Sequence, residues 1–244
     1  MSSLGVPLVV AALRAGATLD DLRARYALAL SRAVEHPNLV LLKYDQLESP
    51  LGDPLVRQCR GLIVDEADGY RVVSRSFDKF WNHGEAHADA IDFATATVQE
   101  KLDGSLCVLY HHDGAWRVQT SGSADAAGPV GRTGRRFSDL FWEVFAAMGY
   151  DLPTDPRRCY SFELMTPWNR VVIPHTTSRL VLIGVRDRES GEELPLDGGH
   201  GFQVVRAFPL RSLPEILETF AALPPHWTCP NCSAEQRDFL VVDD

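Results

Sequence analysis

Short runs of apolar residues recur along the chain, separated by turns rich in Gly, Pro, Asp and Asn, and this pattern is typical of strands. Asp68-Gly69 and Asp113-Gly114 each lie between two such runs and predict hairpin turns. We expect strands over residues 39–44, 61–64, 71–75, 98–100, 106–110, 115–120, 160–164, 170–174, 180–186 and 239–242.

Other segments place apolar residues at helical spacing. Thr18, with two aspartates just after it, is a typical N-cap, and the helix that it starts is expected to continue to about Glu35. Because strands outnumber helices and most connections are short, we expect an α+β fold with antiparallel-rich mixed sheets and peripheral helices. It would form one domain over residues 1–244, with a helical segment at 1–36. Further helices, each flanked by Gly or Pro, are expected over 83–91, 137–148 and 213–223.

Composition narrows the classes of protein. The chain has 244 residues, 45% of them hydrophobic, which suffices for one sizeable core. It contains no run of eighteen apolar residues and no basic N-terminal segment, so we expect neither a membrane span nor a signal peptide, and a cytoplasmic location. Five cysteines, an odd number scattered through apolar runs, indicate reduced thiols. A formal net charge of −9 argues against coating of nucleic acid by bulk electrostatics but leaves local phosphate binding open.

Local clusters of cysteine and arginine have weaker interpretations. Cys229 and Cys232 form one Cys-x-x-Cys pair without a second pair, so a metal-free loop is the default, and a zinc site shared between two chains is the alternative. Arg157-Arg158 is interpreted as solvated surface. The glycine- and arginine-rich segment 128–136 is the better candidate for a loop that contacts a nucleic-acid strand.

Lysine is rare in this chain, which makes Lys101 informative. Only three of the 24 basic residues are lysines, namely Lys43, Lys79 and Lys101. An amine can lose its proton and attack phosphorus, whereas a guanidinium, with a pKa above about 12, cannot. The segment 101–105, Lys-Leu-Asp-Gly-Ser, therefore has two interpretations. It is either an Asp-Gly hairpin that leaves Lys101 on an exposed flank, or a nucleophile beside a glycine that lets the backbone approach a nucleotide.

Motifs on both sides favour the nucleophile. Arg60-Gly61 and Lys-Phe-Trp-Asn at 79–82 precede it, and Phe-Glu at 162–163 and Pro-Trp-Asn-Arg at 167–170 follow it. In this order the motifs resemble the adenylyltransferase domain of ATP-dependent RNA ligases, the group typified by the phage T4 RNA ligase 1. The resemblance runs from about residue 43 to residue 185 and implies a nucleotidyltransferase fold.

The resemblance also implies a chemistry that uses ATP and Mg²⁺. Lys101 would become adenylylated, and Asp103 would orient it or a metal-bound water. The AMP would pass to a 5′-phosphate, from which a 3′-hydroxyl displaces it, so RNA ends would be the partners. Glu163 is also the candidate magnesium ligand, because a carboxylate inside an apolar run must be paired or coordinated if it is buried. Phe77 has a second interpretation as a core residue. The implied nucleotide-binding residues are Arg60, Phe77, Lys79, Glu100, Gly104, Glu163, Asn169 and Arg170.

The chain departs from the family pattern in its second half. Arg237-Asp238 stands where the family has Glu-Gly, and no lysine follows Lys101. The segment 120–123, Thr-Ser-Gly-Ser, only partly matches a small motif that often carries a lysine before Gly-Ser. Three explanations remain open: a truncated chain, a reduced ligase that uses Arg206 or Arg211 instead, and a degenerate relative. Two functions follow, an RNA ligase-like enzyme and a non-catalytic module that binds nucleotide or RNA ends.

Overall fold

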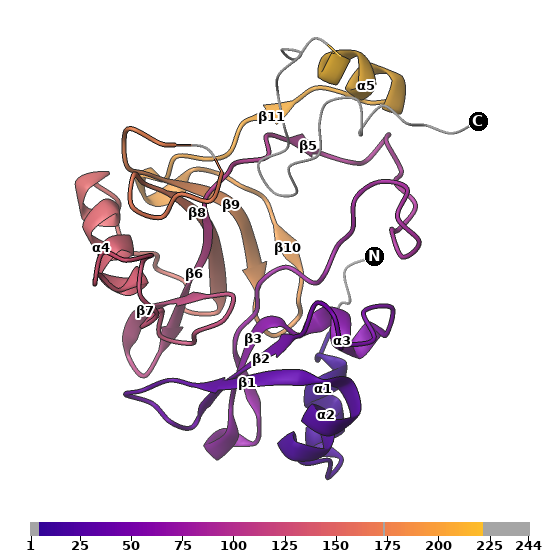
Figure 1. Ribbon diagram of the computed structural model, residues 1–244, viewed down its shortest axis with the longest axis vertical. Coiled ribbons are helices and arrows are strands. Elements are labelled where there is room, and N and C mark those ends of the chain that lie inside the picture. The colour runs from indigo at the N-terminus through magenta and orange to yellow at the C-terminus, as the bar shows by residue number, and fades with distance from the viewer. Residues whose placement is uncertain (1–4, 173, 222–244) are drawn as a thin grey trace.

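The computed structural model describes residues 5–172 and 174–221 (Figure 1). Its helices are α1 Leu8–Arg14, α2 Leu19–Tyr26, α3 Pro54–Gln58, α4 Phe137–Ala147 and α5 Leu213–Ala221, with short 3₁₀ turns η1 Glu66–Asp68 and η2 Gly199–Gly201. Its strands are β1 Leu28–Arg32, β2 Leu39–Tyr44, β3 Arg60–Asp65, β4 Arg71–Ser74, β5 Val98–Gln99, β6 Ser105–His112, β7 Ala115–Thr120, β8 Arg158–Met165, β9 Arg179–Asp187, β10 Glu193–Leu194 and β11 Ala207–Phe208.

The strands form two sheets and a separate two-stranded ribbon (Figure 1). The first sheet has the order β1-β2-β3-β4, the second has the order β10-β9-β8-β6-β7, and the ribbon pairs β5 with β11. Each of these strand pairs is antiparallel. The expected α+β fold with antiparallel-rich sheets and peripheral helices is therefore confirmed.

Alternation along β2 explains how the first sheet is covered on both faces, because successive side chains of a strand point to opposite sides. Val40 and Leu42 belong to the apolar core shared with α1, α2 and α3. Leu39 and Leu41 belong to a second core, which they share with Val108 of the second sheet. The two sheets therefore pack face to face through this second core.

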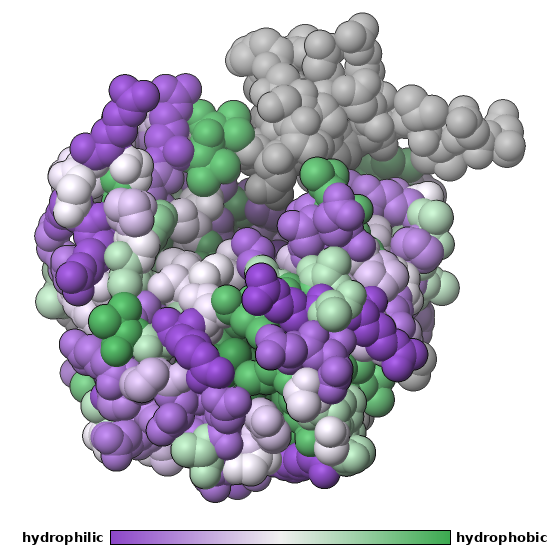
Figure 2. Space-filling model, turned by 60° about the horizontal axis from the view of Figure 1, so that its bottom comes forward, coloured by the Kyte–Doolittle hydropathy of each residue, from purple (hydrophilic) through white to green (hydrophobic). Residues whose placement is uncertain are grey.

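The opposite face of the second sheet is covered by α4. Phe141 and Phe145 of α4 lie in one apolar core with Phe162 of β8, and the rings of Phe141 and Phe162 meet edge to face at 5.9 Å. Apolar residues thus fill three layers of core, between α1–α3 and the first sheet, between the sheets, and between the second sheet and α4. The face shown in Figure 2 is mainly hydrophilic, with smaller apolar groups between.

Most of the predicted strands are confirmed. The strands expected over 39–44 and 115–120 have the observed bounds, and six others agree within two residues at each end. The β6–β7 hairpin turns at Asp113-Gly114, where both residues have positive φ, 50° and 74°. The pair Asp68-Gly69 lies in the β3–β4 hairpin, as expected. Of the predicted helices, 137–148 corresponds to α4 and 213–223 begins as α5, while residues 222–223 and the strand expected over 239–242 lie outside the described residues.

The helix expected to run from Thr18 to about Glu35 is wrong in its second half. Thr18 does cap α2, since its hydroxyl accepts a hydrogen bond from the Asp21 amide at 3.1 Å. The helix ends at Tyr26, and Ala27 adopts a left-handed conformation with φ 51°. The next residues pair with β2 as strand β1. Leu30 continues the helical spacing of Leu22 and Tyr26, but it also alternates with Leu28 as in a strand, so pairing with β2 decided the outcome.

Two other expected elements are also wrong. Residues 83–91 form turns instead of a helix, and most of their side chains are exposed, so no apolar face holds a helix there. Among the described residues of 170–174 there is no strand. The Val172 amide donates to the Asp103 carboxylate at 3.0 Å instead of to a neighbouring strand. The short helices α1 and α3 were not expected.

Three cysteines, Cys59, Cys107 and Cys159, are buried and free, as the reduced-thiol interpretation predicts. Cys229 and Cys232 lie outside the described residues, so their zinc alternative stays untested. No helix within the described part of the chain is long and apolar enough to cross a lipid bilayer.

Candidate active site

A cavity of about 290 Å³ lies where the start of β3, the segment after β4, and strands β6, β8 and β9 come together. Half of the ten site residues that the ordered motifs predict line this cavity. The segment between β5 and β6 closes one side of the cavity. The lining residues are Arg60, Phe77, Phe80, Gln99, Glu100, Lys101, Leu102, Leu106, Glu163 and Ile183.

Lys101 lies on the segment that crosses from the β5–β11 ribbon to β6. Its amine donates a hydrogen bond to the Leu102 carbonyl oxygen at 2.9 Å, and it makes no ion pair within 4.0 Å with a described residue. The hairpin interpretation of the Asp-Gly pair is wrong, because β5 pairs with β11 and not with β6. The Glu100 amide continues this pairing by donating to the Arg206 carbonyl oxygen at 2.9 Å. Lys101 is itself exposed, as the hairpin interpretation expected, but it lines the cavity from a segment that this pairing holds.

Glu163 supplies the buried carboxylate of the cavity. It lies in the middle of β8, opposite Leu106 of β6, and is 8% exposed. Burial raises the pKa of Glu163 to about 7, an effect that Lys101 and a hydrogen bond from the Gly104 amide oppose. A carboxylate in this state can hold a proton or balance a cation near neutral pH. The expectation that a buried carboxylate at this position is paired or coordinated is met by the hydrogen bond from the Gly104 amide, while Lys101 acts on Glu163 through its charge without a close ion pair.

The raised pKa has a testable consequence for stability. Glu163 binds its proton more tightly in the folded chain, so its ionisation costs stability as pH rises from about 4.5, the unfolded value, to about 7. Glu163→Gln stays neutral and can still accept the Gly104 hydrogen bond. We expect it to be more stable than wild type at pH 8 by on the order of 3 kcal/mol, with the difference vanishing near pH 4.5. Urea unfolding at both pH values measures this, and a difference independent of pH would contradict the burial argument.

Two cations lie on the side of the cavity near the first sheet. The Arg60 guanidinium lies 4.5 Å from the centre of the Phe80 ring, and its buried Nη1 has no hydrogen-bond partner among the described residues. The Lys79 amine lies 4.8 Å from the Trp81 ring and donates to the Phe80 carbonyl oxygen at 2.9 Å. Burial lowers the pKa of Lys79, Glu85 opposes this, and Arg60 adds to it. Lys79 stands beside Arg60 without lining the cavity itself.

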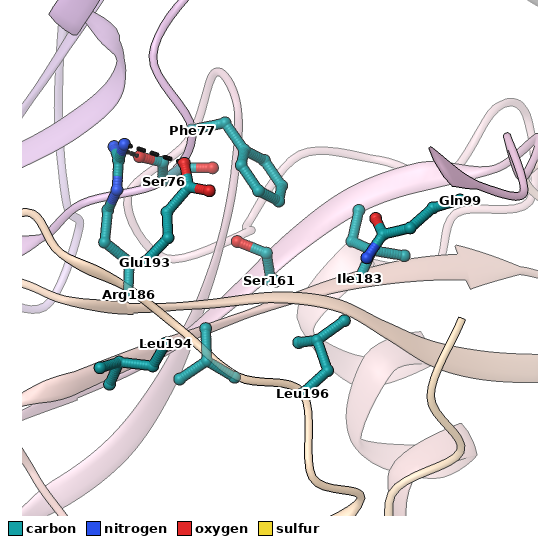
Figure 3. A pocket seen from close by; sticks show the side chains of 11 residues that line it. Ser76, Phe77, Gln99, Ser161, Ile183, Arg186, Glu193, Leu194 and Leu196 are labelled. Atoms are coloured by element: carbon teal, nitrogen blue, oxygen red, sulfur yellow. Dashed lines mark hydrogen bonds and ion pairs between the residues drawn. The ribbon is translucent and has the colours of Figure 1, made fainter. Parts of the chain in front are cut away.

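Phe77 separates the cavity from a smaller one of about 120 Å³ (Figure 3). Its half-buried ring packs against Gly184 of β9, where any Cβ would clash with it. Ser161 and Ile183 lie near the ring, as Figure 3 shows. Phe77 is thus a wall of the site and not a residue of the four apolar cores.

Asp103 and Asn169 fasten the loop after β8 to the Lys101 segment. Asp103 is 3% exposed, and its carbonyl oxygen lies 2.6 Å from His175 Nε2. Asn169 Nδ2 donates to Ser105 Oγ at 3.0 Å and to the Leu164 carbonyl oxygen at 2.7 Å. These two residues do not line the cavity, and the catalytic role expected of Asp103 stays a prediction.

Arg170 and Gly104 also lie outside the cavity wall. Arg170 is exposed and donates to the Val172 carbonyl oxygen at 3.0 Å. Gly104 is required for another reason than expected, because a Cβ there would clash with the Leu164 carbonyl oxygen of β8. The lack of a side chain at Gly104 lets β6 approach β8 closely. Direct nucleotide contacts by Gly104, Asn169 and Arg170 stay predictions.

Sequence reasoning missed Arg186, which holds the residues on both sides of Phe77. This β9 arginine is 4% exposed, and its Nη1 donates to the Ser76 carbonyl oxygen at 2.6 Å and to Asp78 Oδ1 at 2.9 Å. Its Nη2 lies 3.3 Å from Glu193 (Figure 3). A charged residue near the end of the apolar run 180–186 was the signal that could have found it. Gln99 and Ile183 were missed because only the folded chain brings them to the cavity.

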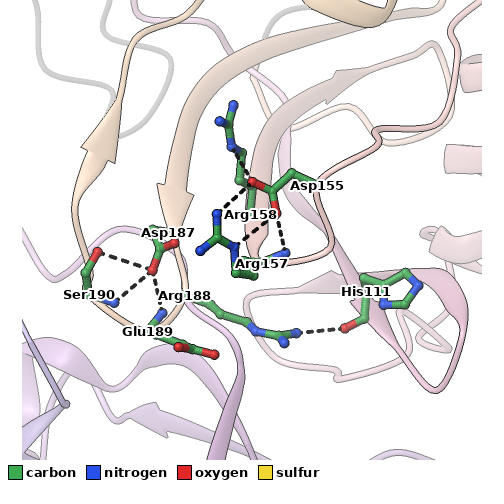
Figure 4. Close-up of polar contacts among 8 residues, drawn as sticks. All are labelled: His111, Asp155, Arg157, Arg158, Asp187, Arg188, Glu189 and Ser190. Atoms are coloured by element: carbon green, nitrogen blue, oxygen red, sulfur yellow. Dashed lines mark hydrogen bonds and ion pairs between the residues drawn. The ribbon is translucent and has the colours of Figure 1, made fainter.

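Two arginine-rich segments have different surroundings. Arg157 and Arg158 both pair with Asp155 at the far end of the second sheet (Figure 4), as the solvated-surface interpretation predicts. In the segment 128–136, Arg135 stacks on Trp168 at 4.8 Å and pairs with Glu143. That segment therefore contacts the loop after β8, and its nucleic-acid role stays a prediction.

Glu163 would hold a magnesium ion if phosphate oxygens and water supplied the other ligands. No group of three or more His, Cys, Asp or Glu residues that could hold a metal gathers in the part of the chain that the structure describes. Mg²⁺ in nucleotide sites often takes one or two carboxylates and completes its shell with phosphate oxygens and water. The buried Glu163 carboxylate in the cavity matches that need.

Comparison with known proteins gives a consistent result. Residues 58–197 match the RNA ligase family. The RNA ligase of Rhodothermus phage RM378 is 34% identical over 170 residues, 54% of this chain, and this chain spans 38% of its length. An archaeal ATP-dependent RNA ligase has the same fold, with a TM-score of 0.52, 16% identity, and coverage of 89% of this chain and 58% of that one.

A further short match lies apart from these. A rubredoxin from the uptake hydrogenase operon of Azotobacter chroococcum mcd 1 is 60% identical over 25 residues, which are 10% of this chain and 35% of that protein. A match to a tenth of the chain assigns no fold to the rest.

The nucleotidyltransferase fold inferred from the ordered motifs is supported by the ligase structures.

Proposed function

Because the chain belongs to the RNA ligase family, we propose that it is an ATP-dependent nucleotidyltransferase that forms a lysyl-AMP intermediate on Lys101. The observation that carries the proposal is the cavity in which Lys101, the buried Glu163 and the unpartnered Nη1 of Arg60 meet. A nucleophilic amine, a carboxylate and a cation are the groups that nucleotidyl transfer needs.

In the first step, Lys101 Nζ would attack the α-phosphorus of ATP. The P–N bond forms, the bond to the bridging oxygen breaks, and pyrophosphate leaves with the electron pair. The amine must first lose a proton, and the nearby Glu163 carboxylate, with its pKa of about 7, is able to accept one. Arg60 would pair with the leaving phosphates through two parallel donors, and Lys79 would add a point charge. Where Mg²⁺ is bound, Glu163 would hold it instead of accepting the proton, which would then pass to solvent, and the metal would supply neutralisation of part of the phosphate charge.

In the later steps, AMP would move from Lys101 to an RNA end. A 5′-phosphate oxygen attacks the adenylyl phosphorus, the P–N bond breaks, and the Lys101 amine leaves and regains its proton. A 3′-hydroxyl then attacks the 5′-phosphorus, joins the strands and releases AMP. Arg237-Asp238, which stands where the family has Glu-Gly, lies outside the described part of the chain. These later steps therefore rest on family membership alone.

The experiment compares two labels with the wild-type chain and Mg²⁺. With α-labelled ATP we expect acid-labile label on the protein in a denaturing gel, because AMP stays on Lys101 through a phosphoramidate bond. With γ-labelled ATP we expect none, because that phosphate leaves in pyrophosphate. Label from γ-labelled ATP alone would indicate phosphorylation instead, because the α-phosphate then leaves in ADP. A folded chain that binds ATP and takes no label would support the alternative, a ligase-derived module that binds nucleotide or RNA ends.

Arg206 and Arg211, the basic residues of the reduced-ligase explanation, lie near the Lys101 segment in the fold, and neither lines the cavity. The Arg206 carbonyl oxygen accepts from the Glu100 amide, and Arg211 Nη1 donates to the Ala96 carbonyl oxygen at 3.3 Å. Both therefore adjoin the segment that leads to Lys101.

We further propose that the whole chain acts as one adenylyltransferase domain in the cytoplasm, where free cysteines such as Cys59 are usual.

A further inference from the structure

Lys43 is a basic residue near the end of β2, on the face that meets the second sheet. The alternate residues Leu39 and Leu41 lie on the same face and form part of the core between the sheets. Lys43 is the register partner of Arg60, which lines the cavity. The ladder has a β-bulge between Leu42 and Lys43, so the Lys43–Arg60 pair lies at its irregular end. Lys43 is therefore at the end of this core, on the strand beside the one that carries Arg60 of the candidate site.

Across from Lys43 is a tight turn of the second sheet. The turn 120–123 is closed by a backbone hydrogen bond of 3.0 Å, and a Cβ at its Gly122 would lie 3.7 Å from the Lys43 amine. Gln119 at the start of the turn donates to the Gly61 carbonyl oxygen at 2.6 Å. This bond holds the turn against β3, next to Arg60. Residues from both sheets thus meet around the amine.

The donors at this position have no protein acceptor. The half-buried Lys43 amine makes no hydrogen bond and no ion pair within 4.0 Å to any residue that the structure describes. The amides of Ser121 and Gly122 likewise donate to none of the described residues. Arg60, the register partner of Lys43, adds a buried Nη1 that has no hydrogen-bond partner among the described residues. Backbone amides and cations that converge in this way bind anions.

Charge gives the class of anion. Lys43 and Arg60 face each other across a β-bulge between β2 and β3, and each also interacts with a carboxylate, Lys43 with Asp45 and Arg60 with Glu163. A group with two negative charges interacts with both cations at once. Terminal phosphates carry up to two charges at neutral pH and several acceptor oxygens.

We propose that Lys43, Arg60 and the Ser121-Gly122 turn bind a terminal phosphate group. The inference rests on the proposed function only for the source of that phosphate, which is either the γ-phosphate of ATP or the 5′-phosphate of a nucleic-acid strand. In both cases Lys43 acts as a binding residue at the edge of the cavity and not as a nucleophile.

The test measures equilibrium binding to wild type and Lys43→Met, which keeps most of the aliphatic stem. The probes are ATP, AMP, and one short RNA with either a 5′-phosphate or a 5′-hydroxyl. We expect Lys43→Met to weaken binding about tenfold or more for one phosphate-bearing probe, since a charge-assisted hydrogen bond is lost. Loss for ATP but not AMP assigns the γ-phosphate. Loss for the phosphorylated RNA but not its hydroxyl counterpart assigns the strand end.

Two further variants keep the result interpretable. Lys43→Arg retains the charge and should bind within a few fold of wild type. Arg23→Met removes an equal charge from the exposed face of α2 and should change nothing. A folded Lys43→Met that binds all four probes like wild type would overturn the inference. This test measures binding and not labelling. A wild-type chain that takes no AMP label would therefore refute the proposed function, whereas the Lys43 inference would still be decided by the binding data.

Discussion

Lys101→Ala is expected to take no label from α-labelled ATP under conditions in which the wild-type chain is fully labelled. The reason is chemical, because alanine has no nucleophile and no neighbouring amine stands in the cavity wall. Only one hydrogen bond of the Lys101 side chain is seen in the structure, to the adjacent Leu102 carbonyl oxygen, so the fold should not depend on it. Denaturing gels after incubation with Mg²⁺ measure the loss.

Lys101→Arg is the matched control for this experiment. It keeps a cation at the position, and a guanidinium stays protonated and cannot attack phosphorus. We expect it to bind ATP within about tenfold of wild type, as judged by calorimetry, and to take no label. Label on either variant would show that another group is the nucleophile and would remove Lys101 from the mechanism.

Arg186→Leu is expected to lower the free energy of unfolding by about 3–5 kcal/mol, because it leaves buried carboxylate charge without its cation. The Asp78 side chain is only 17% exposed, and Arg186 also holds the Ser76 carbonyl oxygen. ATP binding should weaken as well, since the released segment carries Phe77. Urea unfolding and ATP titration measure the two effects.

An exposed arginine in the same sheet provides the comparison. Arg157 pairs with Asp155 at the surface, with its side chain 64% exposed (Figure 4). Arg157→Leu should cost no more than about 1 kcal/mol, as is usual for surface ion pairs. If both substitutions have small effects, the buried network around Arg186 does not hold the Phe77 wall.

The strands were predictable because their signals are local. The hairpin at Asp113-Gly114 needs two residues that accept positive φ, and the sequence supplies both. The end of α2 was not predictable in the same way. Residues 28–32 read equally well as helix or strand until β2 offers a partner, so the pairing of distant residues decided between them.

The residues of the candidate site also divide into those that local signals reveal and those that depend on distant neighbours. Lys101, Glu163 and Arg60 could be found because the chemistry restricts their residue types and their order along the chain. Arg186 and Lys43 could not, since each acts through neighbours that are far away in sequence. For Gly104 the structure adds a reason that the sequence did not suggest, because its missing side chain serves strand packing against Leu164, while its approach to a nucleotide stays a prediction.

The ribbon of β5 and β11 has a consequence for the order of folding. It joins Gln99, two residues before Lys101, to Ala207, more than one hundred positions later. Contacts this distant close a large loop, and such contacts tend to form late. A growing chain could therefore complete both sheets before the nucleophile has its neighbours. Exchange of the Glu100 amide proton, bonded to Arg206, reports that last event.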